Sequence, residues 1–256
     1  MSSYLPVQHA PKTLIHVKDL HKSFNGNHVL RGISLDVHEK EVMCIIGISG
    51  CGKSTLLRCI SGLETSDAGE IHLEDDNFTM VFQYSALFDS LSVYENVGFS
   101  LLEEPDESTG TTRRFQNLPE AEVRRIVEEK LRLVGLDGIE DKFPNELSGG
   151  MQKRVSFARA IVSDPKIILY DEPTAGLDPI ASTVIEDYIL KLRDELEAAS
   201  VVVTHQHSTI HRAADRICLL HEGRVQWIGT PQELERTDNP YARQFANASL
   251  EGPLTD

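Results

Sequence analysis

The sequence lacks any apolar run long enough to cross a membrane. Its purely apolar stretches are short, as at residues 42–46 and 201–203, whereas a membrane-spanning helix needs about 20 such residues. Residues 1–12 also lack the basic start and the apolar core of a secretory signal. We therefore expect the chain to stay in a cytosol-like compartment and to reach any membrane only through a partner.

Cysteine is scarce as well, and positive charge is in short supply. The four cysteines form no CxxC pair and no cluster, which argues against a disulfide framework or a zinc site. The 25 Lys and Arg residues against 40 Asp and Glu residues leave a formal charge of −15. This acidity disfavours nucleic acid and anionic lipid as direct partners, and its plain interpretation is solubility.

What is present is an alternation of predicted strands and helices, typical of an α/β protein. Polar and apolar residues alternate over 33–37, as in a half-buried antiparallel strand. Continuous apolar runs at 42–46, 167–170 and 200–204 predict strands that are covered on both faces. A hairpin is predicted over residues 217–228.

Helices are predicted between these strands. Residues 53–62, 119–136 and 179–197 carry apolar side chains at helical spacing. Residues 91–165 form a predicted helical insertion, interrupted by a polar loop at 103–117. We divide the chain into an N-terminal extension (1–13), a RecA-like core with a β-subdomain (14–90 and 166–236), the helical subdomain (91–165) and a C-terminal tail (237–256).

Residues 47–54, GISGCGKS, match the P-loop pattern GxxxxGK[ST], and a predicted buried strand and helix flank them. Glycines let the backbone wrap around phosphate oxygens, and the helix N-terminus adds positive potential. Lys53 should neutralise β- and γ-phosphate charge, and Ser54 should hold Mg²⁺. A chance glycine-rich turn is the disfavoured alternative. The predicted nucleotide contacts of this loop are Gly47, Ser49, Gly50, Cys51, Gly52, Lys53, Ser54 and Thr55.

Two predictions near the phosphate site leave alternatives open, one for Cys51 and one for the pair Asp171 and Glu172. Helix-end amides would lower the pKa of the Cys51 thiol, but a small loop residue whose sulfur has no role is the favoured interpretation. Asp171 and Glu172 end the predicted strand 167–170, where adjacent carboxylates are ordinarily solvated. With a P-loop in the same chain, we instead expect Asp171 to reach Mg²⁺ and Glu172 to act as general base.

A second anion site is predicted where Ser148, Gly149 and Gly150 open a helix. One chain already has its phosphate loop, so a second site makes sense if it serves ATP held by another copy. An ordinary Ser–Gly helix cap is the alternative. We expect a homodimer around two ATP molecules, each clamped between Lys53 of one copy and Ser148 of the other.

In this order the motifs GISGCGKS, LSGGMQ, IILYDE, residues 175–178 and His205 resemble those of the ABC transporter ATPase family. The match spans residues 14–233. The resemblance implies an α/β P-loop NTPase core with an antiparallel β-subdomain and an inserted α-helical subdomain, with ATP and Mg²⁺ bound. A two-cassette ATPase of translation or DNA repair is a poorer match for a chain with one cassette and a short helical insertion.

The resemblance also implies roles for single residues. Gln83 corresponds to the Q-loop glutamine, Asp178 to the D-loop at the dimer contact, and His205 to the switch histidine that reaches the γ-phosphate. Phe24 corresponds to the aromatic stacked on adenine, with a core or strand-edge aromatic as its alternative. Catalysis is thus assigned to Glu172, His205, Gln83 and Lys53; nucleotide contacts beyond the P-loop to Phe24, Ser148, Gly149, Gly150 and Asp178; and Mg²⁺ to Ser54, Gln83 and Asp171.

Residues 82–91 and 170–180 look like the lipid-transport branch, which includes the ATPases of the bacterial Mla system and of the chloroplast trigalactosyldiacylglycerol importer. Residues 204–210 and 244–253 resemble the chloroplast type, and the lack of a transit peptide favours a cyanobacterial protein. The resemblance implies a permease dimer, a mammalian-cell-entry type lipid-binding protein, (phospho)lipid cargo and attachment to the cytoplasmic face of the inner membrane. An importer of another small solute is the alternative.

Three further expectations concern the edges of these motifs. A permease helix should dock near Gln83, with Leu87, Phe88, Leu91 and Tyr94 as candidates to line the groove. For at least half of these four, a place in the core of the helical subdomain is the favoured interpretation. Residues 72–81 are shorter than the family pattern, which puts that edge of the subdomain in doubt. His207 and His211 are expected on the surface, and Tyr241 and Phe245 of the tail are expected to pack on their own chain.

Overall fold

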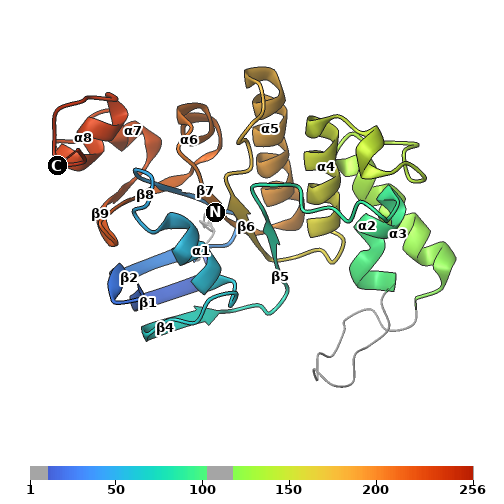
Figure 1. The fold of residues 1–256 in the computed structure, drawn as a ribbon, viewed down its shortest axis with the longest axis horizontal. Helices are drawn as coiled ribbons and strands as arrows, with labels where there is room; N and C mark the ends of the chain where they lie inside the picture. Colours follow the sequence, from blue (N-terminus) through green and yellow to red (C-terminus); the bar gives the residue numbers. More distant parts are fainter. Residues whose placement is uncertain (1–10, 103–117, 256) are drawn as a thin grey trace, which may run out of the picture.

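The computed structural model describes residues 11–102 and 118–255, which fold into two β-sheets and a set of surrounding helices (Figure 1). The loop predicted at 103–117 and residues 1–10 of the predicted extension lie outside this part. The strands are β1 Thr13–Phe24, β2 Asn27–His38, β3 Val42–Ile46, β4 Ala68–Leu73, β5 Phe78–Val81, β6 Ile167–Asp171, β7 Ala199–Val203, β8 Arg216–His221 and β9 Arg224–Gly229. The helices are α1 Lys53–Ile60, α2 Val93–Leu102, α3 Glu120–Leu133, η1 Pro144–Glu146, α4 Gly149–Ala160, α5 Pro179–Leu196, α6 His207–Ala213, α7 Pro231–Leu234 and α8 Pro240–Ala246.

The larger sheet has the order β5-β6-β7-β3-β8-β9 and is parallel except for β9. Every residue of β3, β6 and β7 is buried, as expected for apolar strands covered on both faces. Alternate residues of β3 belong to different hydrophobic clusters: Met43 and Ile45 pack with α1 and the smaller sheet, and Cys44 and Ile46 pack with the other helices. The predicted α/β class follows from this layering.

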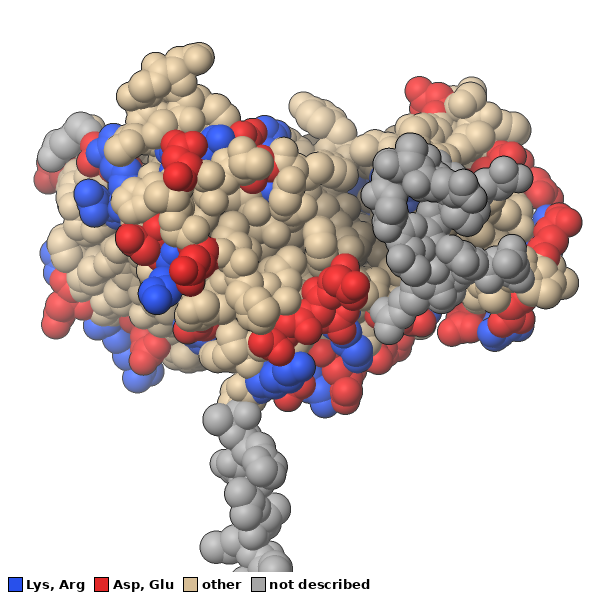
Figure 2. Space-filling model, turned by 90° about the horizontal axis from the view of Figure 1, so that it is seen from below, with Lys and Arg blue, Asp and Glu red and all other residues tan. Residues whose placement is uncertain are grey.

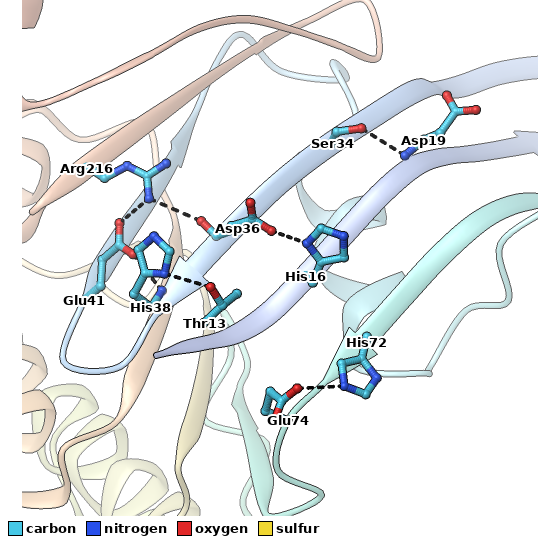
Figure 3. A network of polar contacts seen from close by, with 10 residues as sticks. All are labelled: Thr13, His16, Asp19, Ser34, Asp36, His38, Glu41, His72, Glu74 and Arg216. Carbon is cyan, nitrogen blue, oxygen red and sulfur yellow. Dashed lines mark hydrogen bonds and ion pairs between the residues drawn. The ribbon is translucent and has the colours of Figure 1, made fainter. Parts of the chain in front are cut away.

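The smaller sheet is antiparallel, in the order β2-β1-β4. The apolar residues of the alternation predicted over 33–37 are Ile33, Leu35 and Val37, and all three are buried on the inner face of this sheet. His16 and Asp36 pair across the two longest strands on its exposed face (Figure 3). Beside the end of β2, Arg216 of β8 binds the buried Glu41 at 2.9 Å.

The shortened segment 72–81 passes from one sheet to the other. It ends β4, makes a four-residue connection over 74–77, and then forms β5 at the edge of the larger sheet. The Asn77 amide donates to the carbonyl oxygens of Ser163 and Asp164, each at 2.9 Å. This edge is thus anchored to the residues just before β6, although the segment is short.

The hairpin of β8 and β9 supports the phosphate loop. Its turn residues Glu222 and Gly223 have φ values of 47° and 70°, the combination that a type I′ turn requires. The Gly223 amide donates to the Cys51 carbonyl at 3.2 Å, and the Arg31 amide donates to the Gly223 carbonyl at 2.8 Å. The turn therefore connects the P-loop to β2.

All described elements between residues 91 and 165 are helical: α2, α3, η1 and α4. The fully buried Asn96 of α2 fixes the turn before it, because its amide donates to the carbonyl oxygens of Phe88, Leu91 and Ser92. Of the four candidates for permease docking, Leu87 and Tyr94 pack against the core and Phe88 is 45% exposed. The core interpretation thus holds for half of them.

The C-terminal tail contains α8, which the sequence pattern does not predict. Tyr241 and Phe245 of this helix pack against the core of their own chain, as predicted. The Phe245 ring lies 5.4 Å from that of His207, which is exposed as predicted. The buried Gln244 accepts a hydrogen bond from the Leu254 amide at 2.7 Å, so the residues after α8 are also held.

Charged side chains of both signs are interspersed on the described surface seen in Figure 2. Over residues 11–102 and 118–255, no helix combines the length and the apolar character needed to traverse a bilayer.

Candidate nucleotide site

The P-loop follows the buried strand β3 and leads into α1. Gly47 has a φ of 148°, and a Cβ there would lie 2.2 Å from the carbonyl oxygen of Leu220. Gly50 and Gly52 have φ values of 80° and 108°, also in the region that favours glycine. The N-cap residue of α1 is Gly52, which has no side chain to accept a hydrogen bond. The first backbone amides of α1 are therefore not occupied by a capping side chain. This is the backbone arrangement that a phosphate group requires.

Lys53 is buried to 9% exposure at the floor of this loop. Its Nζ donates to the carbonyl oxygens of Gly47 at 2.9 Å and Ile48 at 3.0 Å. The thiol of Cys51 is also buried, and burial raises its pKa despite the opposing charge of Lys53. The helix-end effect therefore does not activate Cys51, in line with the interpretation that gave its sulfur no role.

Two of the three predicted Mg²⁺ ligands are in direct contact. The Ser54 hydroxyl of α1 donates to Asp171 Oδ1 at 3.0 Å, and Asp171 ends β6 with 7% exposure. Gln83, the third predicted ligand, lines the same pocket as Ser54. A hydroxyl, a carboxylate and an amide oxygen are the hard oxygen donors that Mg²⁺ prefers, so these residues fit the ion.

Glu172 and His205 form a pair beside this site. They follow the neighbouring parallel strands β6 and β7, and Glu172 Oε1 lies 2.8 Å from His205 Nδ1. Glu172 has a φ of 49°, unusual for a residue other than glycine, and its amide donates to the Val203 carbonyl at 2.9 Å. Its Oε2 is buried and has no hydrogen-bond partner among the described residues, so one carboxylate oxygen remains free to accept a proton.

Most of these groups line a single pocket of about 350 Å³, although Gly47, Cys51 and Asp171 do not. It includes all four residues predicted to be catalytic. The lining residues are Val29, Ser49, Gly50, Gly52, Lys53, Ser54, Thr55, Gln83, Glu172 and His205.

Val29 and Phe24 mark the limits of the sequence prediction at this pocket. Val29, a wall residue from β2, was missed, because one apolar residue in a strand carries no distinguishing pattern. Phe24 ends β1, is 41% exposed and does not line the pocket. A buried core position for Phe24 is therefore wrong, and its stacking on adenine stays a prediction.

A second pocket of about 510 Å³ contains the other predicted nucleotide residues. Ser148 caps α4 by accepting a hydrogen bond from the Met151 amide at 3.3 Å. Asp178 caps α5 by accepting from the amides of Ile180 and Ala181 at 2.9 and 3.0 Å. The pocket is lined by Ser148, Gly149, Gly150, Arg154, Gly176, Leu177, Asp178, Ala181, Val184 and Ile185.

The predicted nucleotide residues thus form two separate groups. Ser49, Gly50, Gly52 and residues 53–55 line one pocket with Gln83, Glu172 and His205, and Ser148, Gly149, Gly150 and Asp178 line another. Gly47, Cys51 and Phe24 line neither pocket. Arg154 in the second pocket was missed, since an arginine in an amphipathic helix is ordinarily a surface residue.

Known proteins resemble this chain over most of its length. The family described as ABC transporter matches residues 30–175. The chain is 43% identical to Protein TRIGALACTOSYLDIACYLGLYCEROL 3, chloroplastic, of Arabidopsis thaliana, over 94% of this chain and 75% of that protein. It is 38% identical to the sulfate/thiosulfate import ATP-binding protein CysA of Methylococcus capsulatus, over 90% of this chain and 67% of that protein.

Solved structures share the fold. CbiO1 of Clostridium perfringens, part of the transporter complex CbiONQ, has a TM-score of 0.78 at 30% identity, covering 89% of this chain and 92% of that one. The ATP-binding cassette MJ0796, a dimer in a post-hydrolysis state bound to ADP and Pi, has a TM-score of 0.73 at 30% identity, covering 85% and 98%. The predicted family, fold and ATPase activity are confirmed. The chain therefore belongs to the ABC transporter family, as an ATP-binding subunit that hydrolyses ATP.

Proposed function

We propose that two copies of this chain close around two ATP molecules, each held by residues 47–55 of one copy and by Ser148 and Gly150 of the other. The observation that carries the proposal is the division of the nucleotide residues between two pockets. Gly149 and Gly150 support it, because a Cβ at either would meet no atom within 4 Å. Nothing in the packing of residues 11–102 and 118–255 requires glycine there, whereas a phosphate or a second copy approaching closely does.

In the closed pair, the P-loop amides and Lys53 bind the β- and γ-phosphates. Glu172 accepts a proton from the attacking water, and its hydrogen bond to His205 orients both side chains toward the γ-phosphate. Mg²⁺, held by Ser54, Asp171 and Gln83, would neutralise charge on the transferred phosphoryl group. Loss of the γ-phosphate then releases the contact with Ser148 and opens the pair.

Opening and closing would drive a permease dimer at the cytoplasmic face of the inner membrane. A groove of about 500 Å³ beside Gln83 supports a docked permease helix, and its rim carries the 80% exposed side chain of Tyr84. The subunit would in this way be peripheral to the membrane. It would transmit closure through the segment that contains Gln83.

The cargo we propose is a (phospho)lipid, delivered with a mammalian-cell-entry type protein in a Mla-like, cyanobacterial system. The motif resemblance to the lipid-transport branch supports this, as does the 43% identity to the TRIGALACTOSYLDIACYLGLYCEROL 3 protein. The 38% identity to CysA favours the second candidate, an importer of a small solute.

Isolation of the chain from its native membrane with its associated proteins, followed by mass spectrometry of bound lipid, separates the two. A permease and a lipid-binding protein with enriched lipid are expected. A permease that carries no enriched lipid would leave the ATPase mechanism intact and overturn the lipid assignment.

A further inference from the structure

A buried lysine joins the helix of the LSGG motif to the segment that carries Gln83. Lys153 of α4 is 5% exposed. Its Nζ donates hydrogen bonds to the backbone carbonyl oxygens of Gln83 and, at 3.4 Å, of Phe82. Within the described residues this ammonium has carbonyl partners and no paired carboxylate, and the charge of Asp171 acts on it only from farther away.

Such an arrangement is costly for a residue that only packs a helix. A buried charge is ordinarily paired with an opposite one, because removal from water disfavours the charged form. Burial accordingly lowers the pKa of Lys153 to about 8. An apolar side chain would pack the helix without this cost, which points to the hydrogen bonds themselves as the function of Lys153.

A second cation of the same helix holds the same segment. Arg159 donates to the carbonyl oxygens of Ala86 at 2.8 Å and Ser85 at 3.4 Å. Ala86 has a φ of 48°, a strained value for a residue other than glycine, so this backbone conformation needs support. The segment between β5 and α2 runs past α4 (Figure 1). Lys153 and Arg159 of α4 therefore both bind the backbone of this segment.

Helix α4 lines the second nucleotide pocket and the groove beside Gln83. Its cap Ser148 lines the second pocket, and Lys153 lies within the next turns, where it lines the groove shared with Gln83. A helix is rigid over so few residues, so a displacement at Ser148 displaces the ammonium and the carbonyl that it binds. We propose that Lys153 is a positioning residue that couples the Ser148 pocket to Gln83 and so sets the Mg²⁺ requirement of hydrolysis.

This inference rests on the proposed function, since it takes Gln83 as a Mg²⁺ ligand and Ser148 as a contact to the other copy's ATP. A purely structural role for Lys153 is the competing explanation. Lys130 of α3 is the matched control: it is also 5% exposed, but it pairs with Asp164 at 2.5 Å and not with the segment of Gln83. Lys130→Met should lower thermal stability and leave the Mg²⁺ dependence of the ATPase unchanged.

The experiment measures kcat and the Mg²⁺ concentration for half-maximal ATPase activity in the full chain, together with equilibrium ATP binding in the absence of Mg²⁺. For Lys153→Met we expect about a tenfold lower kcat and a similarly raised Mg²⁺ requirement, with ATP affinity in the absence of Mg²⁺ within about twofold of the wild type. Lys153→Arg, which can still donate to both carbonyl oxygens, should recover most of both losses.

A folded Lys153→Met with the wild-type Mg²⁺ requirement would overturn the proposal. If that variant does not fold, Lys153→Ala, which also removes the donor but places less apolar bulk beside the carbonyl oxygens, takes its place under the same criterion. Gln83→Ala is measured beside them. If Gln83→Ala itself leaves the Mg²⁺ requirement unchanged, the proposed role of Gln83 has failed. If Gln83→Ala raises the Mg²⁺ requirement and the Lys153 variants do not, the role of Gln83 stands and only the proposed coupling through Lys153 has failed.

Discussion

The two glycine-rich helix starts of this chain are built differently. At the P-loop, Gly47 is pressed against the Leu220 carbonyl and Lys53 is buried, so neighbouring strands determine its conformation. At the LSGG motif, Ser148 and Gly149 are exposed, and Gly150 has open space where a side chain would lie. The packing of its own chain fixes the first loop, whereas the described residues leave open space at the glycines of the second. This contrast is what we expect if, as proposed, the second motif binds phosphate only together with another copy.

The largest expected effect is on hydrolysis at the complete site. Glu172→Gln keeps the size and a hydrogen bond to His205 but does not accept a proton, so ATPase activity should fall about 10²- to 10⁴-fold while ATP binding persists. Phosphate release and equilibrium ATP binding measure the two properties, and size-exclusion chromatography with ATP should reveal a trapped dimer. Asp36→Asn is the control and should be fully active, because it alters another carboxylate paired with a histidine, His16, in the smaller sheet. Rapid hydrolysis by Glu172→Gln would exclude it as the general base.

The two sites can be separated by mixing variants. Lys53→Met should lower ATP affinity about 10- to 100-fold, because it removes a charged hydrogen-bond donor, and Ser148→Arg should block the exposed second site. Each alone is expected to be nearly inactive. An equal mixture should recover about a quarter of wild-type ATPase activity, because about half of the dimers are mixed and each mixed dimer has one intact site of two. A mixture as inactive as its components would contradict a site shared between copies.

Alanine substitutions at Gly47 and Gly150 test the difference between the two glycine-rich helix starts through the free energy of unfolding. Gly47→Ala should lower the free energy of unfolding by about 2 kcal/mol or more, since the new Cβ meets a backbone carbonyl. Gly150→Ala, inside a helix and in open space, should raise it by about 0.5–1 kcal/mol and yet lower ATPase activity. Chemical denaturation and phosphate release provide both readouts. Equal destabilisation by the two substitutions would contradict the conclusion that local packing requires glycine at position 47 but not at position 150.

The smallest effect is expected at the cap of α5. Asp178→Ala removes the acceptor of two backbone amides, which should cost about 1 kcal/mol and about 2–4 °C in melting temperature. Asp178→Asn retains the cap and should melt like the wild type. If Asp178→Asn nevertheless loses ATPase activity, its carboxylate has the second role that the family resemblance predicts. An unchanged melting temperature for Asp178→Ala would show that the cap is unimportant.

Prediction from sequence succeeded where the relevant pattern is local. The strands at 42–46 and 167–170, the helix from Pro179 and the hairpin around Glu222 all lie within one or two residues of their predicted bounds. It missed α6 and α8, because each has seven residues and too few apolar positions to show a period. It also missed Lys153, since nothing in the helix spacing distinguishes a lysine that reaches a backbone carbonyl from one in water.

By itself the sequence determined the phosphate chemistry of this protein. Eight consecutive residues between a buried strand and a helix contain the glycines, the lysine and the hydroxyl, so no distant contact is needed to recognise them. Only the tertiary structure decided which groups meet. Glu172 reaches His205 because β6 and β7 are parallel neighbours, and Lys153 reaches Gln83 from 70 residues away along the chain. Such contacts depend on the order of strands in the sheet and on how α4 packs beside it, which short-range patterns do not encode.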